Sequence, residues 1–220
     1  MARTRGCLRV CLAADDPSLP PSLQIPVPAA ERVLDWGYFF DPLRPVEVDV
    51  GCGKGRFILA RARAFPETQF LGIEREDARV ARIDLVARRE GLRNLRVLKT
   101  DAMVALTDYL PTGVVEAVYL FFPDPWPKRR HHKRRLFTPV FLDAIHRILK
   151  PGGAIHVATD RPDYFRIMRQ CLDSDARFHG IEPFQRQPEE QTDFELIFRG
   201  QGLSINEASY RRDGTTDGPR

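Results

Sequence analysis

The sequence predicts an α/β fold built on a mostly parallel, doubly wound sheet, with an antiparallel strand at its C-terminal end. Two observations support this prediction. Short apolar or β-branched runs alternate with helix-like stretches along most of the 220-residue chain, which is the pattern of strand–helix–strand units. A glycine-rich turn also follows the first strong strand signal, as is common where such a sheet binds a ligand.

The elements follow one another at ordinary spacing. Strand signals occur at 46–50, 69–74, 95–99, 115–122, 154–160 and 194–199. Helical stretches are expected at 56–65, 77–90, after Asp101, at 136–149 and at 163–173. The run 115–122 is apolar and long enough for the centre of the sheet. Pro151-Gly152-Gly153 is expected to end the helix at 136–149.

The two ends of the chain differ from this pattern. Residues 1–30 carry five prolines and no sustained period, so we predict a mobile arm. The pattern of strands and helices predicts a single domain over residues 31–203. The polar residues 204–220 are predicted to form a frayed tail.

Composition excludes several classes of protein. The chain has 34 Lys and Arg, 30 Asp and Glu, and 43% hydrophobic residues, so it is not disordered throughout. No stretch approaches the roughly 20 uncharged apolar residues of a membrane span. Arg9 interrupts the short apolar run near the N-terminus, which argues against a secretory signal. The four cysteines have no metal-ligand or disulfide spacing, so we expect a cytoplasmic protein with no metal.

The turn after the first strand is Asp-Val-Gly-Cys-Gly-Lys-Gly, residues 49–55. Its glycines permit a tight turn and let a ligand approach backbone amides at a helix N-terminus. A nicotinamide fingerprint would place its third glycine where this chain has Arg56. The spacing G-x-G-x-G after an acid instead resembles the first motif of S-adenosylmethionine-dependent methyltransferases, and Asp49 can meet the cationic methionyl end of that cofactor.

Acidic residues also follow the next two strands. Glu74 can accept hydrogen bonds from both ribose hydroxyls of an adenosine. Asp101, followed by Ala102, can face the adenine amino group, although aspartate is also a common helix N-cap. Three acids at three consecutive strand ends therefore predict a cofactor site.

The fourth strand leads into Phe-Phe-Pro-Asp-Pro-Trp-Pro, residues 121–127, and then into the basic run Lys-Arg-Arg-His-His-Lys-Arg-Arg, residues 128–135. Prolines stiffen the backbone, so Asp124 and Trp126 are presented in a fixed geometry. An aromatic ring can stack on a nucleobase, and a carboxylate can accept hydrogen bonds from it. The basic run can hold phosphates, so nucleic acid is the expected partner; the alternative is a solvated charged face.

The segment PDPWPKRRHHKRR, with the upstream DVGCGKG, resembles the bacterial tRNA (guanine-N(7)-)-methyltransferases. Two later elements match as well: Thr159-Asp160 after the fifth strand, and Thr192-Asp193-Phe194-Glu195 followed by Gly202. The resemblance covers roughly residues 31–205. It implies a Rossmann-like class I methyltransferase fold, S-adenosylmethionine as cofactor, and methylation of guanosine 46 in the variable loop of tRNA.

The resemblance also implies roles for single residues. The cofactor site would comprise Asp49, Gly51, Gly53, Gly55, Glu74, Asp101 and Asp124. Asp124 would also be the catalytic residue. Substrate contacts would come from Lys128, Asp160, Thr192, Asp193, Phe194 and Glu195, and phosphate contacts from Arg129, Arg130, Lys133, Arg134 and Arg135. One departure is Asp49, where the family more often has the longer glutamate.

Two rival functions remain open at this point. An enzyme that methylates an exocyclic amine also places an acid or amide, prolines and an aromatic after the fourth strand, but usually with two adjacent prolines. In this chain Pro123 and Pro125 flank Asp124 instead. A non-catalytic RNA-binding protein on the same fold would not need four carboxylates at the strand ends. The sequence leaves open whether the protein is a monomer or a homodimer.

Overall fold

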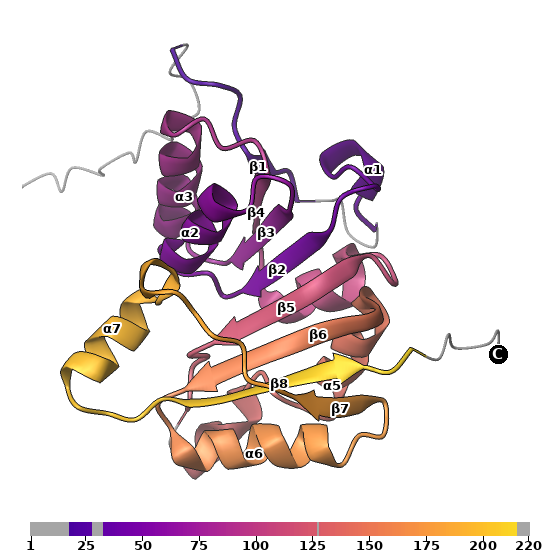
Figure 1. Ribbon diagram of the computed structural model, residues 1–220, viewed down its shortest axis with the longest axis vertical. Helices are drawn as coiled ribbons and strands as arrows, with labels where there is room; N and C mark the ends of the chain where they lie inside the picture. Colours follow the sequence, from indigo (N-terminus) through magenta and orange to yellow (C-terminus); the bar gives the residue numbers. More distant parts are fainter. Residues whose placement is uncertain (1–17, 28–32, 127, 215–220) are drawn as a thin grey trace, which may run out of the picture.

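A computed structural model describes residues 18–27, 33–126 and 128–214. Eight strands form one sheet in the order β1-β4-β3-β2-β5-β6-β8-β7 (Figure 1). The strands are β1 (Gln24–Ile25), β2 (Val46–Val50), β3 (Gln69–Glu74), β4 (Leu95–Lys99), β5 (Val115–Phe121), β6 (Leu149–Thr159), β7 (Phe178–Ile181) and β8 (Asn206–Arg212). All neighbouring pairs from β1 to β6 are parallel, whereas β8 is antiparallel to β6 and β7.

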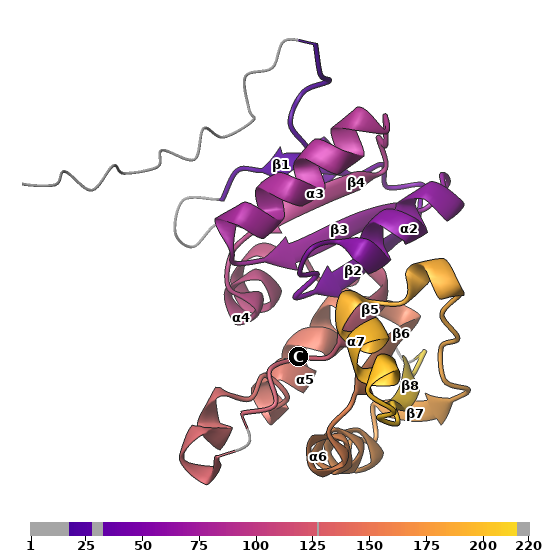
Figure 2. The same ribbon diagram turned by 90° about the vertical axis from the view of Figure 1, so that its left-hand side faces the viewer.

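Helices connect these strands and cover both faces of the sheet (Figures 1 and 2). The longer ones are α2 (Arg56–Ala64), α3 (Asp77–Arg89), α5 (Pro139–Ile148), α6 (Pro162–Asp173) and α7 (Asp193–Gly200). The shorter ones are α1 (Trp36–Phe39), α4 (Ala102–Val104), η2 (Ala105–Tyr109), η3 (Arg129–Arg134) and η4 (Pro188–Glu190). The mostly parallel, doubly wound sheet is as predicted, and β5 lies near its centre.

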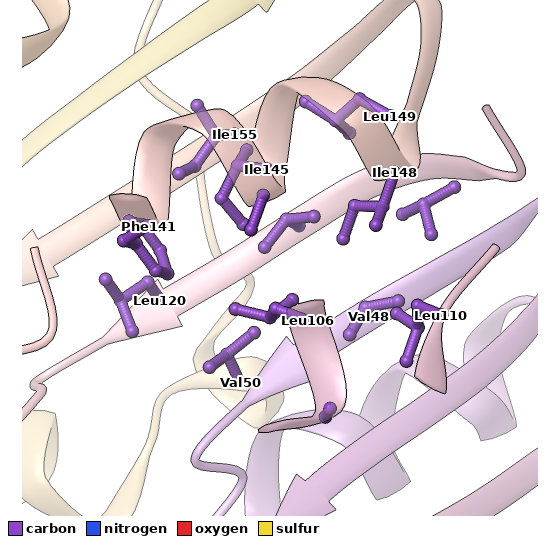
Figure 3. Packing of buried hydrophobic residues seen from close by; sticks show 14 of the residues in the cluster. Val48, Val50, Leu106, Leu110, Leu120, Phe141, Ile145, Ile148, Leu149 and Ile155 are labelled. Carbon is purple, nitrogen blue, oxygen red and sulfur yellow. The ribbon is translucent and has the colours of Figure 1, made fainter. Parts of the chain in front are cut away.

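The core divides between the two faces because side chains alternate along each strand. On one face, Val48 of β2 and Leu120 of β5 pack against Leu106 of η2 and Ile145 of α5 (Figure 3). On the other face, α2 and α3 cover β3 and β4. A third cluster, around Phe57, continues this second face over β5.

The strand predicted at 194–199 was wrong, because these residues form helix α7. Phe-Glu-Leu-Ile-Phe-Arg is apolar enough for a strand, but a short apolar run does not distinguish strand from helix. Thr192 decides the local structure, since its side chain accepts a hydrogen bond from the backbone N–H of Glu195 and caps the helix.

The predicted frayed tail was also wrong for residues 206–212, which form β8. This strand pairs with β6 and β7, and it is the antiparallel strand of the sheet. Its polar side chains have partners inside the protein: Ser209 Oγ lies 2.8 Å from His156 Nδ1. The sheet therefore extends past the predicted domain end at residue 203.

The predicted mobile arm is partly ordered. Ile25 is buried, and β1 pairs with β4 at the edge of the sheet. The Leu23 N–H donates to Asp84 Oδ1 at 2.6 Å, which attaches this segment to α3. Residues 1–17 and 28–30 of the predicted arm lie outside the described residues.

Pro151-Gly152-Gly153 follows the helix end as predicted but lies within β6. The pairing of β5 with β6 shifts register between Val115 and Ala117. Within the described ranges, no helix is long and apolar enough to cross a membrane.

Candidate active site

The chain reverses its direction across the sheet between β2 and β5. It proceeds from β2 to β3 and β4 on one side, and from β5 to β6 on the other. In such sheets ligands bind beyond the carboxyl ends of the strands at this reversal. A cavity of about 780 Å³ lies there, lined by residues that follow β2, β3, β4 and β5 and by α7. In Figure 1 the arrowheads of β2, β5 and β6 point towards the side on which α7 lies.

The glycine-rich turn forms one wall of this cavity. Gly51, Gly53 and Gly55 have φ values of 77°, 57° and 82°, which disfavour any other residue. Gly51 and Gly53 line the cavity, whereas Gly55 does not. A Cβ on Gly55 would lie 2.5 Å from Ile83 Cγ1, so this glycine also permits close packing of α2 on α3.

Asp49 is a buried carboxylate on the cavity wall, with 5% of its surface exposed. No described residue forms a hydrogen bond to its side chain. Burial, together with the nearby charge of Glu74, raises the pKa of Asp49 from 3.8 to about 8. A buried acid without a partner is suited to a cationic ligand, because such a ligand stabilises its ionised form.

Glu74 is also buried on the cavity wall, but its carboxylate forms hydrogen bonds and an ion pair within the protein. Its Oε2 accepts a hydrogen bond from Gly53 N at 3.0 Å, and its Oε1 accepts one from Arg75 N at 2.8 Å. Arg79 lies 3.5 Å from Oε2. Glu74 therefore holds the glycine-rich turn against the end of β3, in addition to facing the cavity.

Asp101 lines the cavity at the end of β4. Its side chain accepts hydrogen bonds from Met103 N at 2.8 Å and Val104 N at 3.4 Å, so it also caps α4. Asp101 is thus the helix N-cap that the sequence also allowed, and its contact with adenine stays a prediction. Its second carboxylate oxygen, Oδ2, forms none of these capping bonds.

The segment after β5 brings Asp124 and Trp126 to the same cavity. Phe122 and Trp126 have φ values of 53° and 40°, in the region that residues other than glycine rarely adopt. Asp124 is exposed at the cavity mouth. The guanidinium carbon of Arg134 lies 4.9 Å from the centre of the Trp126 ring, and the His131 ring lies 5.8 Å from it.

The basic run does not present all its side chains to solvent. Arg130 and Arg134 are exposed, and Arg134 lines the cavity. Arg135 is only 5% exposed, and its guanidinium bonds to Asp163 and to the Pro125 carbonyl. The Arg135 guanidinium therefore faces the protein and not solvent, whereas a phosphate contact requires an accessible side chain. The side chains of Arg129 and Lys133 lie outside the described part of the structure.

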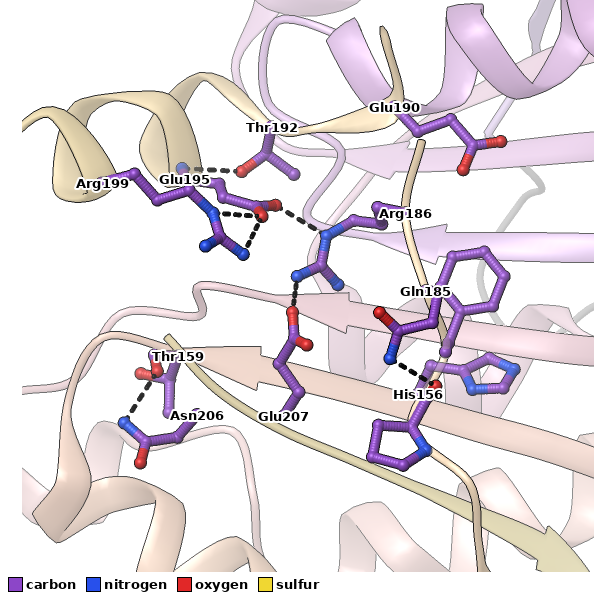
Figure 4. Close-up of polar contacts among 12 residues, drawn as sticks. His156, Thr159, Gln185, Arg186, Glu190, Thr192, Glu195, Arg199, Asn206 and Glu207 are labelled. Carbon is purple, nitrogen blue, oxygen red and sulfur yellow. Dashed lines mark hydrogen bonds and ion pairs between the residues drawn. The ribbon is translucent and has the colours of Figure 1, made fainter. Parts of the chain in front are cut away.

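Helix α7 and its N-cap residue form another part of the cavity wall. Thr192, Asp193 and Phe194 line the cavity, whereas Glu195 is only 1% exposed. Arg186 Nε donates to Glu195 Oε2 at 2.6 Å, and Arg199 Nε donates to Glu195 Oε1 at 2.9 Å (Figure 4). In this arrangement the Glu195 carboxylate anchors α7 and does not line the cavity, and its substrate contact stays a prediction.

Two arginines of α2 hold the segment that leads into α7. Arg56 Nε donates to the Gln191 carbonyl at 2.8 Å. Arg61 Nη1 donates to Glu190 Oε1 at 3.2 Å, and its Nη2 donates to Glu47 Oε2 at 2.9 Å. The sequence analysis did not assign these contacts to Arg56 and Arg61, because the helix at 56–65 was predicted from its apolar positions. No sequence signal indicates the partners Gln191 and Glu190, which lie 135 and 129 residues away along the chain.

Two predicted substrate contacts lie outside the cavity wall. Lys128 is exposed, and its carbonyl accepts a hydrogen bond from His131 N at 2.8 Å. Asp160 follows the end of β6 and is partly buried. Sequence reasoning did not single out Arg75, Arg79 and Ile197, which also line the cavity. Over the described ranges, no group of three or more His, Cys, Asp or Glu side chains could hold a metal ion.

Comparison with solved structures identifies the fold. The 16S rRNA methyltransferase KamB matches with a TM-score of 0.62 and 18% identity, over 83% of this chain and 95% of that one. A SAM-dependent O-methyltransferase from Thermotoga maritima matches with a TM-score of 0.53 and 15% identity, over 79% of this chain and 61% of that one. At this identity the likeness shows a shared fold and not a shared reaction.

Sequence relatives are more specific. A family model described as a putative methyltransferase matches residues 43–200. A tRNA (guanine-N(7)-)-methyltransferase from Halorhodospira halophila is 40% identical over 204 residues, covering 90% of this chain and 87% of the relative. One from Macrococcus caseolyticus is 36% identical over 186 residues, covering 82% and 87%. Because these relatives align over most of both chains, this protein belongs to the family of tRNA (guanine-N(7)-)-methyltransferases.

Proposed function

We propose that this protein transfers a methyl group from S-adenosylmethionine to N7 of a guanine in tRNA, at guanosine 46 of the variable loop. The observation that carries the proposal is the cavity at the strand reversal, which Asp49, Glu74, Asp101, Asp124 and Trp126 all line. The relatives named as tRNA (guanine-N(7)-)-methyltransferases support the same reaction.

The cofactor half of the cavity fits S-adenosylmethionine. Asp49 is buried, has no hydrogen-bond partner among the described side chains, and suits the positively charged methionyl end. Glu74 would accept from the ribose hydroxyls, and Asp101 would face the adenine. Gly51 and Gly53 lie on the same wall, where the lack of a side chain leaves room for a ligand close to the backbone. When bound, this cofactor supplies a methyl group on a positively charged sulfur.

The chemistry requires little proton transfer. N7 of guanine is a free hydrogen-bond acceptor and carries no proton, so no strong general base is needed. The task of the protein is then to align donor and acceptor and to stabilise charge. Asp124 would accept hydrogen bonds from the guanine ring N–H and amino group, and its carboxylate would stabilise the positive charge that the ring gains.

The tRNA side of the site combines aromatic and basic groups. Trp126 and Phe194 line the cavity and offer ring faces to an unstacked base. Lys128, Arg130 and Arg134 are exposed beside it and would contact phosphates. Such contacts are largely independent of sequence, so tRNA shape and the accessible base would determine specificity. Thr192, Asp193 and Asp160 remain proposed substrate contacts.

One alternative has the same fold and cofactor, namely methylation of an exocyclic amine. Product analysis distinguishes the two reactions. Purified protein is incubated with S-adenosylmethionine and unmodified tRNA transcripts, and the digested nucleosides are separated by mass spectrometry. We expect 7-methylguanosine from one variable-loop position. A product methylated on an exocyclic amine would contradict the proposal, and an absence of methylation with cofactor bound would favour a non-catalytic RNA-binding protein.

The role of Asp124 has its own test. Asp124→Asn keeps the shape but removes the charge, so turnover should fall by about 100-fold, as for the loss of one electrostatic group aimed at the reacting centre. Cofactor affinity, measured by calorimetry, should change far less. Unchanged turnover would remove Asp124 from the mechanism.

Two properties of the protein stay as the sequence left them. Its oligomeric state, monomer or homodimer, is open, and its cytoplasmic location is a prediction.

A further inference from the structure

The segment from Phe122 to Trp126, which we call the Asp124 loop, is held in an uncommon backbone conformation. Phe122 and Trp126 bracket it with φ values of 53° and 40°. Residues other than glycine keep such conformations only where surrounding contacts enforce them. Pro123 and Pro125 have no N–H, so they cannot donate backbone hydrogen bonds that would fix the loop.

The first half of the loop is fixed by the sheet. The Phe122 N–H donates to the Ala158 carbonyl at 2.7 Å, which continues the pairing of β5 with β6. This contact lies upstream of Asp124. It does not fix the second half of the loop, which carries Trp126.

Arg135 supplies a backbone hydrogen bond to the second half. Its Nε donates to the Pro125 carbonyl at 2.8 Å, and its Nη2 donates to Asp163 Oδ2 at 3.1 Å. Asp163 lies in the first turn of α6, so one guanidinium joins the loop to that helix. The guanidinium carbon also lies 4.7 Å from the centre of the Tyr164 ring.

The surroundings of Arg135 are buried and hydrogen-bonded. Tyr164 is fully buried, and its hydroxyl accepts a hydrogen bond from Phe137 N at 3.2 Å. Asp163 also accepts a hydrogen bond from Arg161 Nε at 3.2 Å. The Arg135 side chain is only 4% exposed. A planar guanidinium can serve two acceptors in fixed directions, which a lysine ammonium on a flexible stem does less well.

Other members of the basic run are placed differently. Arg130 is exposed and its Nε donates to His131 Nε2 at 3.2 Å. Arg134 is exposed and lies over the Trp126 ring. A phosphate could reach Arg130 and Arg134 from solvent, whereas Arg135 faces the protein interior.

We propose that Arg135 is a positioning residue, which holds the Asp124 loop in the conformation that presents Asp124 and Trp126 to the base. Arg135 acts through the Pro125 carbonyl and contacts neither tRNA nor cofactor. This inference rests on the proposed function, because it assumes that Asp124 orients the guanine. It assigns the last arginine of the basic run to catalytic geometry and not to RNA affinity.

Steady-state kinetics with three variants test this assignment. Arg135→Met and Arg135→Lys are compared with Arg130→Met, a matched change at an exposed arginine of the same run. For both Arg135 variants we expect kcat to fall about 10- to 100-fold, as for a small displacement of a catalytic group, with little change in KM for tRNA. The salt dependence of tRNA binding should stay that of the wild type. Arg130→Met should instead raise KM and flatten the salt dependence.

A phosphate contact by Arg135 predicts the reverse. Arg135→Lys would then resemble the wild type, and Arg135→Met would raise KM and flatten the salt dependence while kcat stays the same. That pattern would overturn the inference.

A second measurement does not depend on enzyme activity, and its circular dichroism control identifies a variant that folds poorly. In a Trp36→Phe background, Trp126 is the remaining tryptophan, so its quenching by acrylamide reports the order of the loop. We expect Arg135→Lys and Asp163→Asn to raise the quenching constant about twofold without loss of far-UV circular dichroism, since each weakens the bridge without emptying the site. Unchanged quenching in both variants would overturn the inference.

The two arms separate this inference from the proposed function. If the wild type methylates no tRNA, the proposed function fails, while the quenching arm still decides whether Arg135 orders the loop. If the wild type is active and the Arg135 variants match it in kcat and in quenching, only the positioning role fails.

Discussion

The carboxylate of Asp49 lies buried beside that of Glu74, and the two groups differ in their partners. Glu74 accepts three backbone hydrogen bonds, from Gly53, Arg75 and Glu76. Asp49 has none among the described residues, so its neutral form is favoured until a cation arrives. The contrast explains how two adjacent acids can have different roles: Glu74 fixes the glycine-rich turn, and Asp49 is available to a positively charged ligand.

The raised pKa of Asp49 predicts a pH-dependent stability. Because its pKa rises from 3.8 to about 8 on folding, the folded state holds a proton that the unfolded state releases between these values. The stability that neutral Asp49 contributes is therefore fully present below pH 3.8 and is lost as pH rises through about 8. In cofactor-free protein, Asp49→Asn should lack this loss, which has a slope of at most about 1.4 kcal/mol per pH unit.

Urea unfolding at pH 5, 6.5 and 8 measures this difference directly. The free energy of unfolding of the wild type should decline relative to that of Asp49→Asn as pH rises. Parallel pH profiles of the two proteins would show that Asp49 titrates normally. Saturating S-adenosylmethionine should reduce the difference, since a cation beside Asp49 favours its ionised form.

Helix α7 shows how far sequence reasoning reaches for a secondary-structure element. The strands β2, β3 and β4 were predicted at their observed bounds, because each is a short β-branched or apolar run followed by a turn. Residues 194–199 have a similar composition but form a helix. Thr192 is a residue type that often caps helices, but it was not interpreted as a cap, and no local pattern indicates Arg186 and Glu207, which hold the helix through Glu195.

The buried charge of Glu195 predicts the stability of this helix. Glu195→Gln leaves Arg186 with one carboxylate, Glu207, in a buried site, since Arg186 is bonded to both acids. Removing one partner of a buried ion pair costs about 3–5 kcal/mol. Glu189 is exposed in the nearby segment η4, and Glu189→Gln serves as the matched control with an expected change below about 0.5 kcal/mol.

Urea denaturation and tRNA binding together test whether Glu195 anchors α7. Glu195→Gln should lower the urea midpoint, and any loss of tRNA affinity should follow from displacement of Phe194 and Thr192. A variant with wild-type stability and a large loss of tRNA affinity would return Glu195 to the role of a direct substrate contact.

The topology of the whole chain explains why the carboxylates could be predicted better than the basic residues. Parallel strands bring their carboxyl ends to one edge, so Asp49, Glu74 and Asp101, at or just after their strand ends, line one cavity. Asp124 follows β5 by three residues and lines the same cavity. The orientation of Arg135 depends instead on Asp163 and Pro125, which no local pattern indicates. For the same reason β8 was missed, since its buried polar side chains have distant partners such as His156.

The charge distribution of the molecule predicts its response to salt. Formal net charge is only +4, so long-range attraction to tRNA should depend on the exposed basic run. Arg130→Gln and Arg134→Gln should each lower the slope of log K against log salt by about 0.7–0.9, the contribution of one phosphate contact. The measurement is tRNA binding between low and moderate salt. If a variant with both changes keeps the wild-type slope, the basic run 128–135 is a solvated charged face and not a phosphate contact.

The proposed acceptor atom is N7 of one guanine, and a tRNA transcript with 7-deazaguanosine at position 46 distinguishes it from every other acceptor. This analogue replaces N7 by C–H and keeps the exocyclic amine and the ring N–H. We predict methyl transfer to the guanosine transcript and none to the 7-deaza transcript, while both compete equally for binding. Equal methylation of the two transcripts would contradict the claim, since the methyl group would then have another acceptor.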